Sequence, residues 1–463
     1  MISNEIRPRR RVFTAMIKVK QILRKSHFIL GMSLALGAFP LQALAVPSFA
    51  QQTGQPCSAC HVGAFGPQLK PYGRDFKLYG YQSSDGKSKV PPIAMTVQTS
   101  VTHTNADQNP PPAPNFGPND NFAVDQVSLY YAGKAPQGFG AFAQFTYDGV
   151  ARSFHIDNVD IRKAKDTTLF GRDSVIGLDF NNSPTVEDVW NTTPAWGFPY
   201  NSSPLSTGGP PTAQIEGALG QQVVGAGVYA LWDDTLYGMV TAYSPLERQF
   251  AGRLGVGTGV TSDRYVGPIP YWRLALLHDF GPQQTVQVGT YGMKAQSYPG
   301  GVTTAGLNSF TDIAVDGTYQ YIGSEKYVWS AHGTYIHETQ DLAANAQLQP
   351  GSRARTELGS ARADLSYSYD NTWTPSVQVF KVDQQTDPNL TTPQGRSSGY
   401  VAELAYVPFG KPNSPLYWVN ARAAIQYIAY REFNGDRVKA SDNNTLYLSF
   451  WVALAPFGAM VHR

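Results

Sequence analysis

Long apolar runs are missing from most of this sequence. After the first fifty residues no stretch of about 20 apolar residues occurs, which is the length that a membrane-spanning helix needs. Helical spanning is therefore excluded for residues 51–463. A basic excess is missing as well: without residues 1–50, which hold eight basic residues and one acidic residue, 28 Lys and Arg remain against 33 Asp and Glu, a net charge of −5. Because no basic face is left to neutralise phosphates, nucleic acid is not an expected partner.

Residues 1–50 have the order of a secretory signal peptide. A basic stretch comes first, an apolar run from Phe28 to Phe39 follows, and small residues then lead to Ala45 and Ala50. The apolar run is too short to span a membrane as a helix. We predict cleavage after Ala45 or Ala50, so that the mature chain leaves the cytoplasm.

Cysteine is nearly absent. The two cysteines of the 463 residues are Cys57 and Cys60, and His61 follows the second directly. C-x-x-C-H is the attachment signature of c-type haem. Two thiols at this spacing reach the two vinyl groups of one porphyrin edge, and the histidine becomes an axial ligand of the haem iron. The sequence therefore predicts one covalent haem c, held by Cys57, Cys60 and His61.

Three other readings of the same residues are open. A disulfide between Cys57 and Cys60 suits an exported protein but gives His61 no role. A thioredoxin-like redox pair needs a βαβ context, which the pattern does not show. A zinc site needs a fourth ligand at short spacing, and the next histidine is His103.

Residues 71–79 are predicted to form a helix. The residues Leu69, Tyr72, Phe76 and Tyr79 recur at helical spacing, Pro71 suits the first turn, and Gly80 suits the position after the last. Tyr72 and Phe76 are expected to pack on the porphyrin. Candidate partners of the haem propionates are Lys70, Arg74 and Lys77, and the alternative for these cations is an ordinary solvated face. A unit of residues 51–90 is smaller than the domains that fold alone. It is therefore expected to pack against a larger domain.

Residues 91–463 alternate between apolar and polar side chains. In ARADLSYSYD, residues 361–370, Ala, Leu and Tyr occupy one face and charged residues and Ser the other, as is typical of strands. Similar runs occupy residues 224–232, 236–243, 272–280, 285–293, 327–337, 416–430 and 444–454. Strands of about 10 residues with one apolar face and aromatic ends are typical of outer-membrane β-barrels.

We therefore predict an all-β fold, a transmembrane outer-membrane β-barrel at residues 91–463. About 23 residues for each strand and turn give roughly 16 antiparallel strands, within the porin range. The bacterial outer membrane and its lipid are the expected location and surroundings. The alternative is a secreted soluble β-protein that buries its apolar face in a sandwich core.

The run from Pro47 to Gln82 carries the specific pattern QTG-x-x-C-x-x-C-H followed by PYGR-x-FKL-x-GY. It resembles the N-terminus of the fused outer-membrane monohaem cytochrome c–porins, the Fe(II)-oxidising outer-membrane cytochromes of iron-oxidising bacteria. NNSPTVEDVWNTTPAWGFPY, residues 181–200, also resembles a loop of that family.

The resemblance implies a haem segment that plugs the pore from inside or at its mouth. It implies an Fe(II):cytochrome oxidoreductase, which takes electrons from an extracellular donor and passes them to a periplasmic cytochrome or copper protein. Fe(II) is the leading candidate for the donor. Two alternatives are open, namely oxidation of a different extracellular reductant and a diffusion porin whose haem segment is a gate or sensor.

The sixth ligand of the haem iron has several candidates. In the run of residues 93–103, Met95 and His103 share a face with apolar neighbours and would point to lipid. His155 and His332 lie among polar neighbours, so both would face the lumen, either as ligands or as ordinary wall residues. A five-coordinate or water-ligated iron is equally open.

The loop at residues 181–200 carries charged and aromatic residues. Asp179, Glu187 and Asp188 flank or enter it and would bind a metal transiently at an entrance, or else serve as ordinary surface carboxylates. Trp190 and Trp196 would guide electron flow or simply pack in the aromatic girdle.

Overall fold

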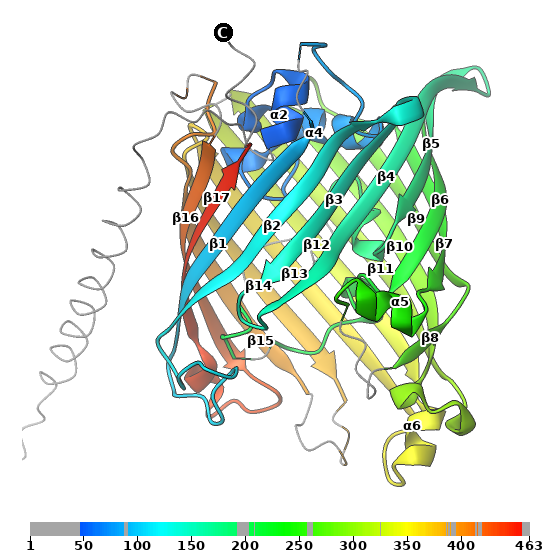
Figure 1. Ribbon diagram of the computed structural model, residues 1–463, viewed down its shortest axis with the longest axis vertical. Helices are drawn as coiled ribbons and strands as arrows, with labels where there is room; N and C mark the ends of the chain where they lie inside the picture. The colour runs from blue at the N-terminus through cyan, green and yellow to red at the C-terminus, as the bar shows by residue number, and fades with distance from the viewer. Residues whose placement is uncertain are drawn as a thin grey trace, which may run out of the picture. The chain divides into compact units, whose positions relative to one another are not determined.

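The computed structural model describes residues 47–87, 91–191, 203–207, 209–256, 263–324, 326–385, 387, 389, 395–412, 414 and 419–455. Within these residues one antiparallel sheet closes on itself (Figure 1). Its strands are β1 (Ile93–Thr104), β2 (Asn121–Ala135), β3 (Phe139–Asp148), β4 (Ser153–Leu169), β5 (Arg172–Asn181), β6 (Val223–Trp232), β7 (Leu236–Pro245), β8 (Arg264–Val266), β9 (Ile269–Asp279), β10 (Gln284–Tyr298), β11 (Asn308–Ser324), β12 (Tyr327–Asp341), β13 (Arg355–Tyr369), β14 (Trp373–Gln384), β15 (Ser397–Tyr406), β16 (Val419–Glu432) and β17 (Thr445–Leu454).

The sheet is a barrel with sixteen strand positions in the described residues. Apart from the short β8, each strand pairs with the next along the chain, so that β7 pairs with β9, and β1 pairs with both β2 and β17, which closes the ring. The short β8 and the longer β9 both pair with β10, so they occupy one position. The predicted count of about 16 antiparallel strands is confirmed.

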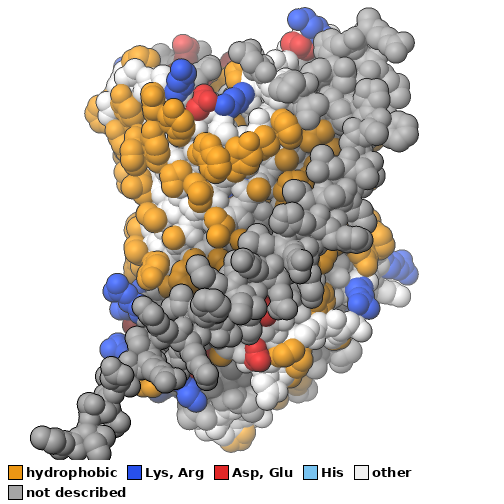
Figure 2. All heavy atoms as spheres, turned by 90° about the vertical axis from the view of Figure 1, so that its left-hand side faces the viewer, with side chains coloured by type: hydrophobic (Ala, Val, Ile, Leu, Met, Phe, Trp, Pro, Cys, Tyr) orange, Lys and Arg blue, Asp and Glu red, His pale blue; other side chains and the backbone are white. Residues whose placement is uncertain are grey.

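The two faces of the wall alternate as predicted. In β1, Ala94 and Thr96 are buried inside, whereas Met95 and His103 lie on the outer face, so the expectation that these two point to lipid is confirmed. On the face that Figure 2 shows, hydrophobic side chains gather over the described part of the wall, and charged side chains lie toward its two ends. A closed wall that is apolar outside and polar inside is a transmembrane barrel of the bacterial outer membrane. This arrangement excludes the sandwich alternative.

The two ends of the barrel differ. Tight turns join strands at one end, for example β4 to β5 and β6 to β7, whereas long connections such as residues 105–120 and 182–222 join them at the other. Short turns are periplasmic and long loops extracellular in such barrels. The helices α2 (Pro47–Thr53), α3 (Cys57–Cys60) and α4 (Pro71–Leu78) lie with the short turns (Figure 1). The N-terminal segment (residues 47–87) is therefore at the periplasmic mouth.

Helix α4 confirms the helix predicted at residues 71–79, with Tyr79 as its C-terminal cap. Phe49 of α2 packs on the rings of Phe76 and Tyr81, with centroids 4.9 and 5.2 Å away, so residues 47–50 are included in the N-terminal segment, and the boundary at residue 51 stays a prediction. Residues 1–46, which hold Ala45 and most of the predicted signal peptide (residues 1–50), lie outside the described residues, whereas Ala50 lies in α2. No helix in the described part of the chain is long and apolar enough to cross a membrane.

The described parts of the β5–β6 connection, residues 182–191, 203–207 and 209–222, are here called the inner loop and reach into the lumen. Its described residues 182–190 are all buried. Arg162 on β4 donates to the carbonyl oxygen of Val186 over 3.0 Å. Further along the inner loop, the backbone N–H groups of Gln214 and Ile215 donate to the carboxylates of Glu338 and Asp312 over 2.6 and 3.1 Å. Two parts of one loop are thus fixed to opposite parts of the wall, and the lumen is occupied.

Candidate functional site

The C-x-x-C-H run folds into one turn of helix and then turns back on itself. The His61 N–H donates to the Cys57 carbonyl over 3.0 Å, and the Lys70 N–H donates to the Cys60 carbonyl over 2.8 Å. His61 also forms a β-bridge with Leu69. The chain between them is held as a closed loop, so all three motif residues have fixed backbone positions.

Helix α4 lies directly on this loop. A Cβ atom at Gly73 would be only 2.5 Å from the carbonyl oxygen of Cys60, which is closer than real side-chain contacts come. Glycine in the PYGR run is therefore required by the approach of two backbones, and α4 is positioned by the haem motif itself.

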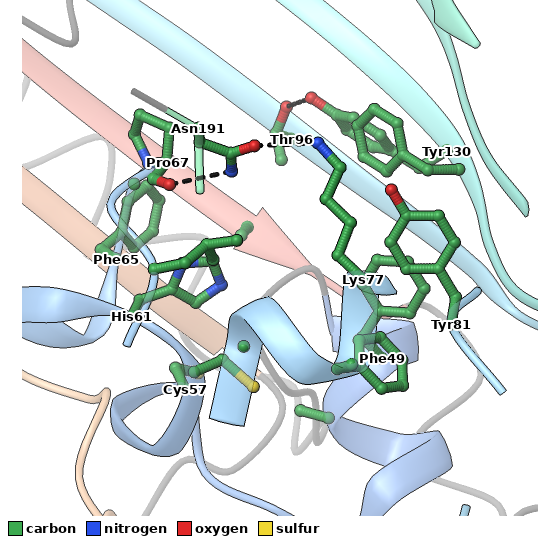
Figure 3. Close-up of a pocket in the computed structure, with 18 of the residues that line it drawn as sticks. Phe49, Cys57, His61, Phe65, Pro67, Lys77, Tyr81, Thr96, Tyr130 and Asn191 are labelled. Atoms are coloured by element: carbon green, nitrogen blue, oxygen red, sulfur yellow. Dashed lines mark hydrogen bonds between the residues drawn. The ribbon is translucent and has the colours of Figure 1, made fainter. Parts of the chain in front are cut away.

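Cys57, Cys60 and His61 line one cavity of about 350 Å³ (Figure 3), a volume within the roughly 300–1,000 Å³ range of small-molecule sites. The N-terminal segment supplies apolar walls, and the inner faces of β1 to β4 supply polar ones. The apolar side chains include Phe49, Ala64, Phe65, Leu69 and Phe76 of the N-terminal segment, with Phe142 on β3 and Trp451 on β17, and the polar ones include Thr96, Gln126, Tyr130, Gln144 and Asp160.

The donor chemistry of this cavity fits haem c. The two described cysteines are thiols rather than a disulfide, and burial together with Cys57 raises the pKa of Cys60 to about 12. Burial lowers the pKa of His61 to about 4, so its ring is neutral, the form that binds metals. The buried His61 Nδ1 has no hydrogen-bond partner in the described part of the structure. Two thiols, a neutral imidazole and apolar walls are the set that a covalent haem requires.

The three cations predicted as haem contacts are all buried, so the solvated-face alternative is wrong. Lys77 lines the cavity, and its Nζ donates to the Asp188 carbonyl over 2.8 Å and to Asn191 Oδ1 over 3.0 Å. Lys70 and Arg74 lie outside the lining and donate to the Ser58 carbonyl and to Thr285 Oγ1.

Of the two predicted aromatic contacts, Phe76 lines the cavity. Tyr72 does not; it is half-exposed at 41 %.

The two candidate sixth ligands are placed elsewhere. His332 lies with its Nδ1 2.8 Å from Asp364 Oδ2 and its Nε2 3.4 Å from Ser330 Oγ, so both ring nitrogens have neighbours. Neither His155 nor His332 is among the cavity-lining residues, and we carry neither into the proposed function.

The carboxylates predicted at a surface entrance are buried instead, and that expectation is wrong. Asp179 pairs with Arg162 over 2.8 Å, and Asp188 lies 3.9 Å from Arg273. Glu187 accepts a hydrogen bond of 2.5 Å from Tyr243. No group of three or more acidic, His or Cys side chains in the described residues has the arrangement of a metal site.

Of the two tryptophans predicted in the same loop, the structure describes Trp190 but not Trp196. Trp190 is buried in the lumen, with its ring 5.1 Å from that of Tyr237, and so is not part of an outer girdle. Trp196 lies outside the described residues.

Sequence reasoning missed how the N-terminal segment is fixed to the barrel. Hydrogen bonds reach it from strands on all sides of the wall. Side chains of the wall that take part are Asp160 on β4, Tyr229 on β6, Thr285 on β10, Gln320 on β11 and Asn420 on β16. A polar face alone could indicate that such residues point inward, but not which segment they meet.

No family model and no curated protein matches the chain. Solved structures with a similar arrangement are outer-membrane proteins. OmpT of Vibrio cholerae has 9 % identity and a TM-score of 0.39, over 78 % of this chain and 96 % of that one. An anion-selective porin from Comamonas acidovorans has 10 % identity and a TM-score of 0.41, over 78 % and 98 %. The outer-membrane channel DcaP of Acinetobacter baumannii has 10 % identity and a TM-score of 0.40, over 78 % and 96 %.

Proposed function

We propose that this chain is an outer-membrane electron-transfer protein with one covalent haem c at the periplasmic mouth of its barrel. It takes electrons from an extracellular reductant, for which Fe(II) is the leading candidate, and passes them to a periplasmic cytochrome or copper protein. The observation that carries the proposal is that Cys57, Cys60 and His61 line one cavity, with the neutral imidazole beside the two thiols.

Each residue of the cavity has a defined part in this proposal. Cys57 and Cys60 would hold the haem as thioethers, and His61 would be its axial ligand. Phe65 and Phe76 exclude water from the cavity. Lys77 places a buried ammonium group beside the cavity, which suits a haem propionate. The haem would supply reversible one-electron chemistry, so the protein needs no bond-making residues.

The position of the cavity supports transfer across the membrane. The hydrocarbon layer is about 30 Å thick, which is too far for an electron to pass without a carrier inside it. The N-terminal segment lies in the periplasmic mouth, and the other end of the barrel faces outward. In this proposal, electrons from an extracellular reductant arrive on the luminal side of the cavity, where the inner loop lies, while a periplasmic carrier meets the N-terminal segment from outside.

The test is stopped-flow reduction of the purified, oxidised protein by Fe(II) without oxygen, followed at the haem absorbance band. We expect reduction by the native protein, and none by Cys57→Ser or His61→Ala. His103→Ala is the matched control, because His103 lies on the outer face and pairs with Asp120. All variants should keep the heat-dependent gel mobility of a folded barrel. A protein without a covalent haem spectrum after export and haem maturation would end the proposal.

The second candidate is a diffusion channel. A porin-like outer-membrane barrel of sixteen strands supports a channel role, since barrels of 16–18 strands leave an aqueous path. Single-channel recording separates the two: conductance like that of an open porin would favour the channel. An N-terminal segment and inner loop that fill the lumen predict a much smaller conductance. Reduction by sulfide or by a humic-type donor, but not by Fe(II), would identify a different extracellular reductant.

A further inference from the structure

A groove runs across the lipid-facing side of the barrel, away from the haem-motif cavity. It has a volume of about 1,110 Å³ and an almost wholly apolar surface. It crosses β4, β5, β6, β7 and β9 and belongs to the outer face, where Leu178, Val228 and Val240 are half-exposed. Its place on the wall puts it in contact with the membrane.

The groove exists because two neighbouring positions have small side chains. Ala230 on β6 lies opposite Gly238 on β7 in the strand register. Larger residues continue this row on both sides, with Ile176 opposite Ala230 and Leu274 opposite Gly238. The row below it has Leu178, Val228 and Val240. The missing side-chain volume at Ala230 and Gly238 therefore deepens the groove at the centre of this row.

Two lysines stand at one end of the groove. Lys163 and Lys165 on β4 pair with Leu178 and Ile176 of the two rows and are both exposed on the outer face. Lys163 Nζ donates to the carbonyl oxygen of Gln137 over 2.9 Å, and Gln137 is in the periplasmic turn between β2 and β3. Neither lysine forms an ion pair with a carboxylate of the described residues. Positive charge thus lies at the level of the periplasmic leaflet.

We propose that this groove binds one phospholipid of the periplasmic leaflet that has an anionic phosphate headgroup. The two ammonium groups bind the headgroup, since anionic lipids attract lysines at the membrane surface. The acyl chains lie over Ala230 and Gly238 and bury apolar surface there. The site is independent of the proposed haem function, because none of its residues lines the haem-motif cavity.

The charges also argue against a second copy of the chain as the occupant. Copies in one membrane have the same orientation, so a two-fold axis must lie along the membrane normal. Such a dimer on this face would bring Lys163 and Lys165 of both copies to the same depth, where like charges repel. A phosphate headgroup has the opposite sign and fits.

Native mass spectrometry of the detergent-purified full chain tests the proposal, with phosphatidylglycerol and phosphatidylcholine added as probes. We expect one phosphatidylglycerol to be retained in preference to phosphatidylcholine. Lys163→Gln and Lys165→Gln should each reduce that preference about fivefold. Ala230→Leu with Gly238→Val should abolish retention of both lipids; a Cβ at Gly238 comes no closer than 3.5 Å to Leu274, so a larger side chain fits.

Matched controls come from the same outer face. Lys294→Gln removes an exposed lysine of β10 near the extracellular end, and Ala402→Leu enlarges a small position between Tyr400 and Leu404 on β15. Both should retain the lipid as the native protein does. If the double variant fails to fold, as its gel mobility would show, Ala230→Val alone should still weaken retention. Equal retention in all variants, or a lipid-free dimer of the native chain, would overturn the proposal.

Discussion

Asn191 donates a hydrogen bond from its Nδ2 to the carbonyl oxygen of Pro67 over 2.9 Å. Its Oδ1 accepts another from Lys77 Nζ over 3.0 Å. One amide of the inner loop therefore holds the N-terminal segment at two points, and all three residues line the cavity that contains His61 (Figure 3). The inner loop is thus part of the site, although it is more than a hundred residues away along the chain.

The first prediction concerns this amide. Asn191→Ala removes two hydrogen bonds, each worth about 1 kcal/mol, so amide hydrogen exchange of residues 61–70 should become roughly tenfold faster or more. Asn389→Ala is the matched control: its amide also donates to a carbonyl, that of Pro350, but it is exposed. Unchanged exchange in Asn191→Ala would show that the inner loop does not hold the segment.

The second prediction concerns Arg162, which is fully buried. It lies 2.9 Å from Asp160 and 2.8 Å from Asp179, and Asp160 in turn accepts a hydrogen bond of 2.5 Å from Tyr81. Arg162→Met leaves two buried carboxylates without their cation. We expect a loss of about 3–5 kcal/mol in the free energy of unfolding, measured by urea titration in detergent.

Two further variants separate the charge effect from a packing effect. Replacing Asp160 and Asp179 by Asn in the Arg162→Met background should recover much of the loss, because no uncompensated charge then remains. Arg437→Met, at an exposed ion pair with Glu432, should change stability by about 1 kcal/mol or less. If Arg162→Met were as stable as Arg437→Met, the buried network would have no structural role.

The third prediction concerns Gly73. A Cβ atom there meets the Cys60 carbonyl oxygen at 2.5 Å, so Gly73→Ala must push α4 away from the haem motif at a cost of about 1–3 kcal/mol. Trypsin should then cleave after Arg74 or Lys77, which are buried in the native chain. Gly252→Ala in α5 (Arg248–Arg253) is the control, since a Cβ there meets nothing within 4 Å. Equal resistance of both variants to trypsin would contradict the close contact.

The fourth prediction concerns the mature N-terminus. Cleavage after Ala50 would remove Phe49, a partly buried residue whose ring packs on Phe76 and Tyr81, and losing these two aromatic contacts costs about 1–3 kcal/mol. Cleavage after Ala45 keeps it. Mass spectrometry of the exported chain should therefore find Val46 as the first residue, and a chain that starts at Gln51 would show that α2 is dispensable.

Local sequence pattern was sufficient for the features that repeat at short range. The alternation of residues 361–370 assigns each side chain to lumen or lipid because neighbouring strand residues point to opposite faces, and the outward Met95 and His103 follow from the same rule. The spacing of Cys57, Cys60 and His61 predicts a covalent haem because the porphyrin fixes the distance between its two thioethers, and the haem itself stays a prediction. The length of residues 91–463, divided by about 23 residues for each strand and its turn, gives roughly sixteen strands.

Only the tertiary structure decided where the inner loop goes and what its charges meet. Asp179, Glu187 and Asp188 have the composition of a surface loop, yet all three are fully buried. Their partners Arg162, Tyr243 and Arg273 come from three different strands, and closure of the barrel brings them together. A sequence pattern shows the two-residue period of a strand. It does not show which distant residues lie together in the lumen, because that depends on closure of the barrel.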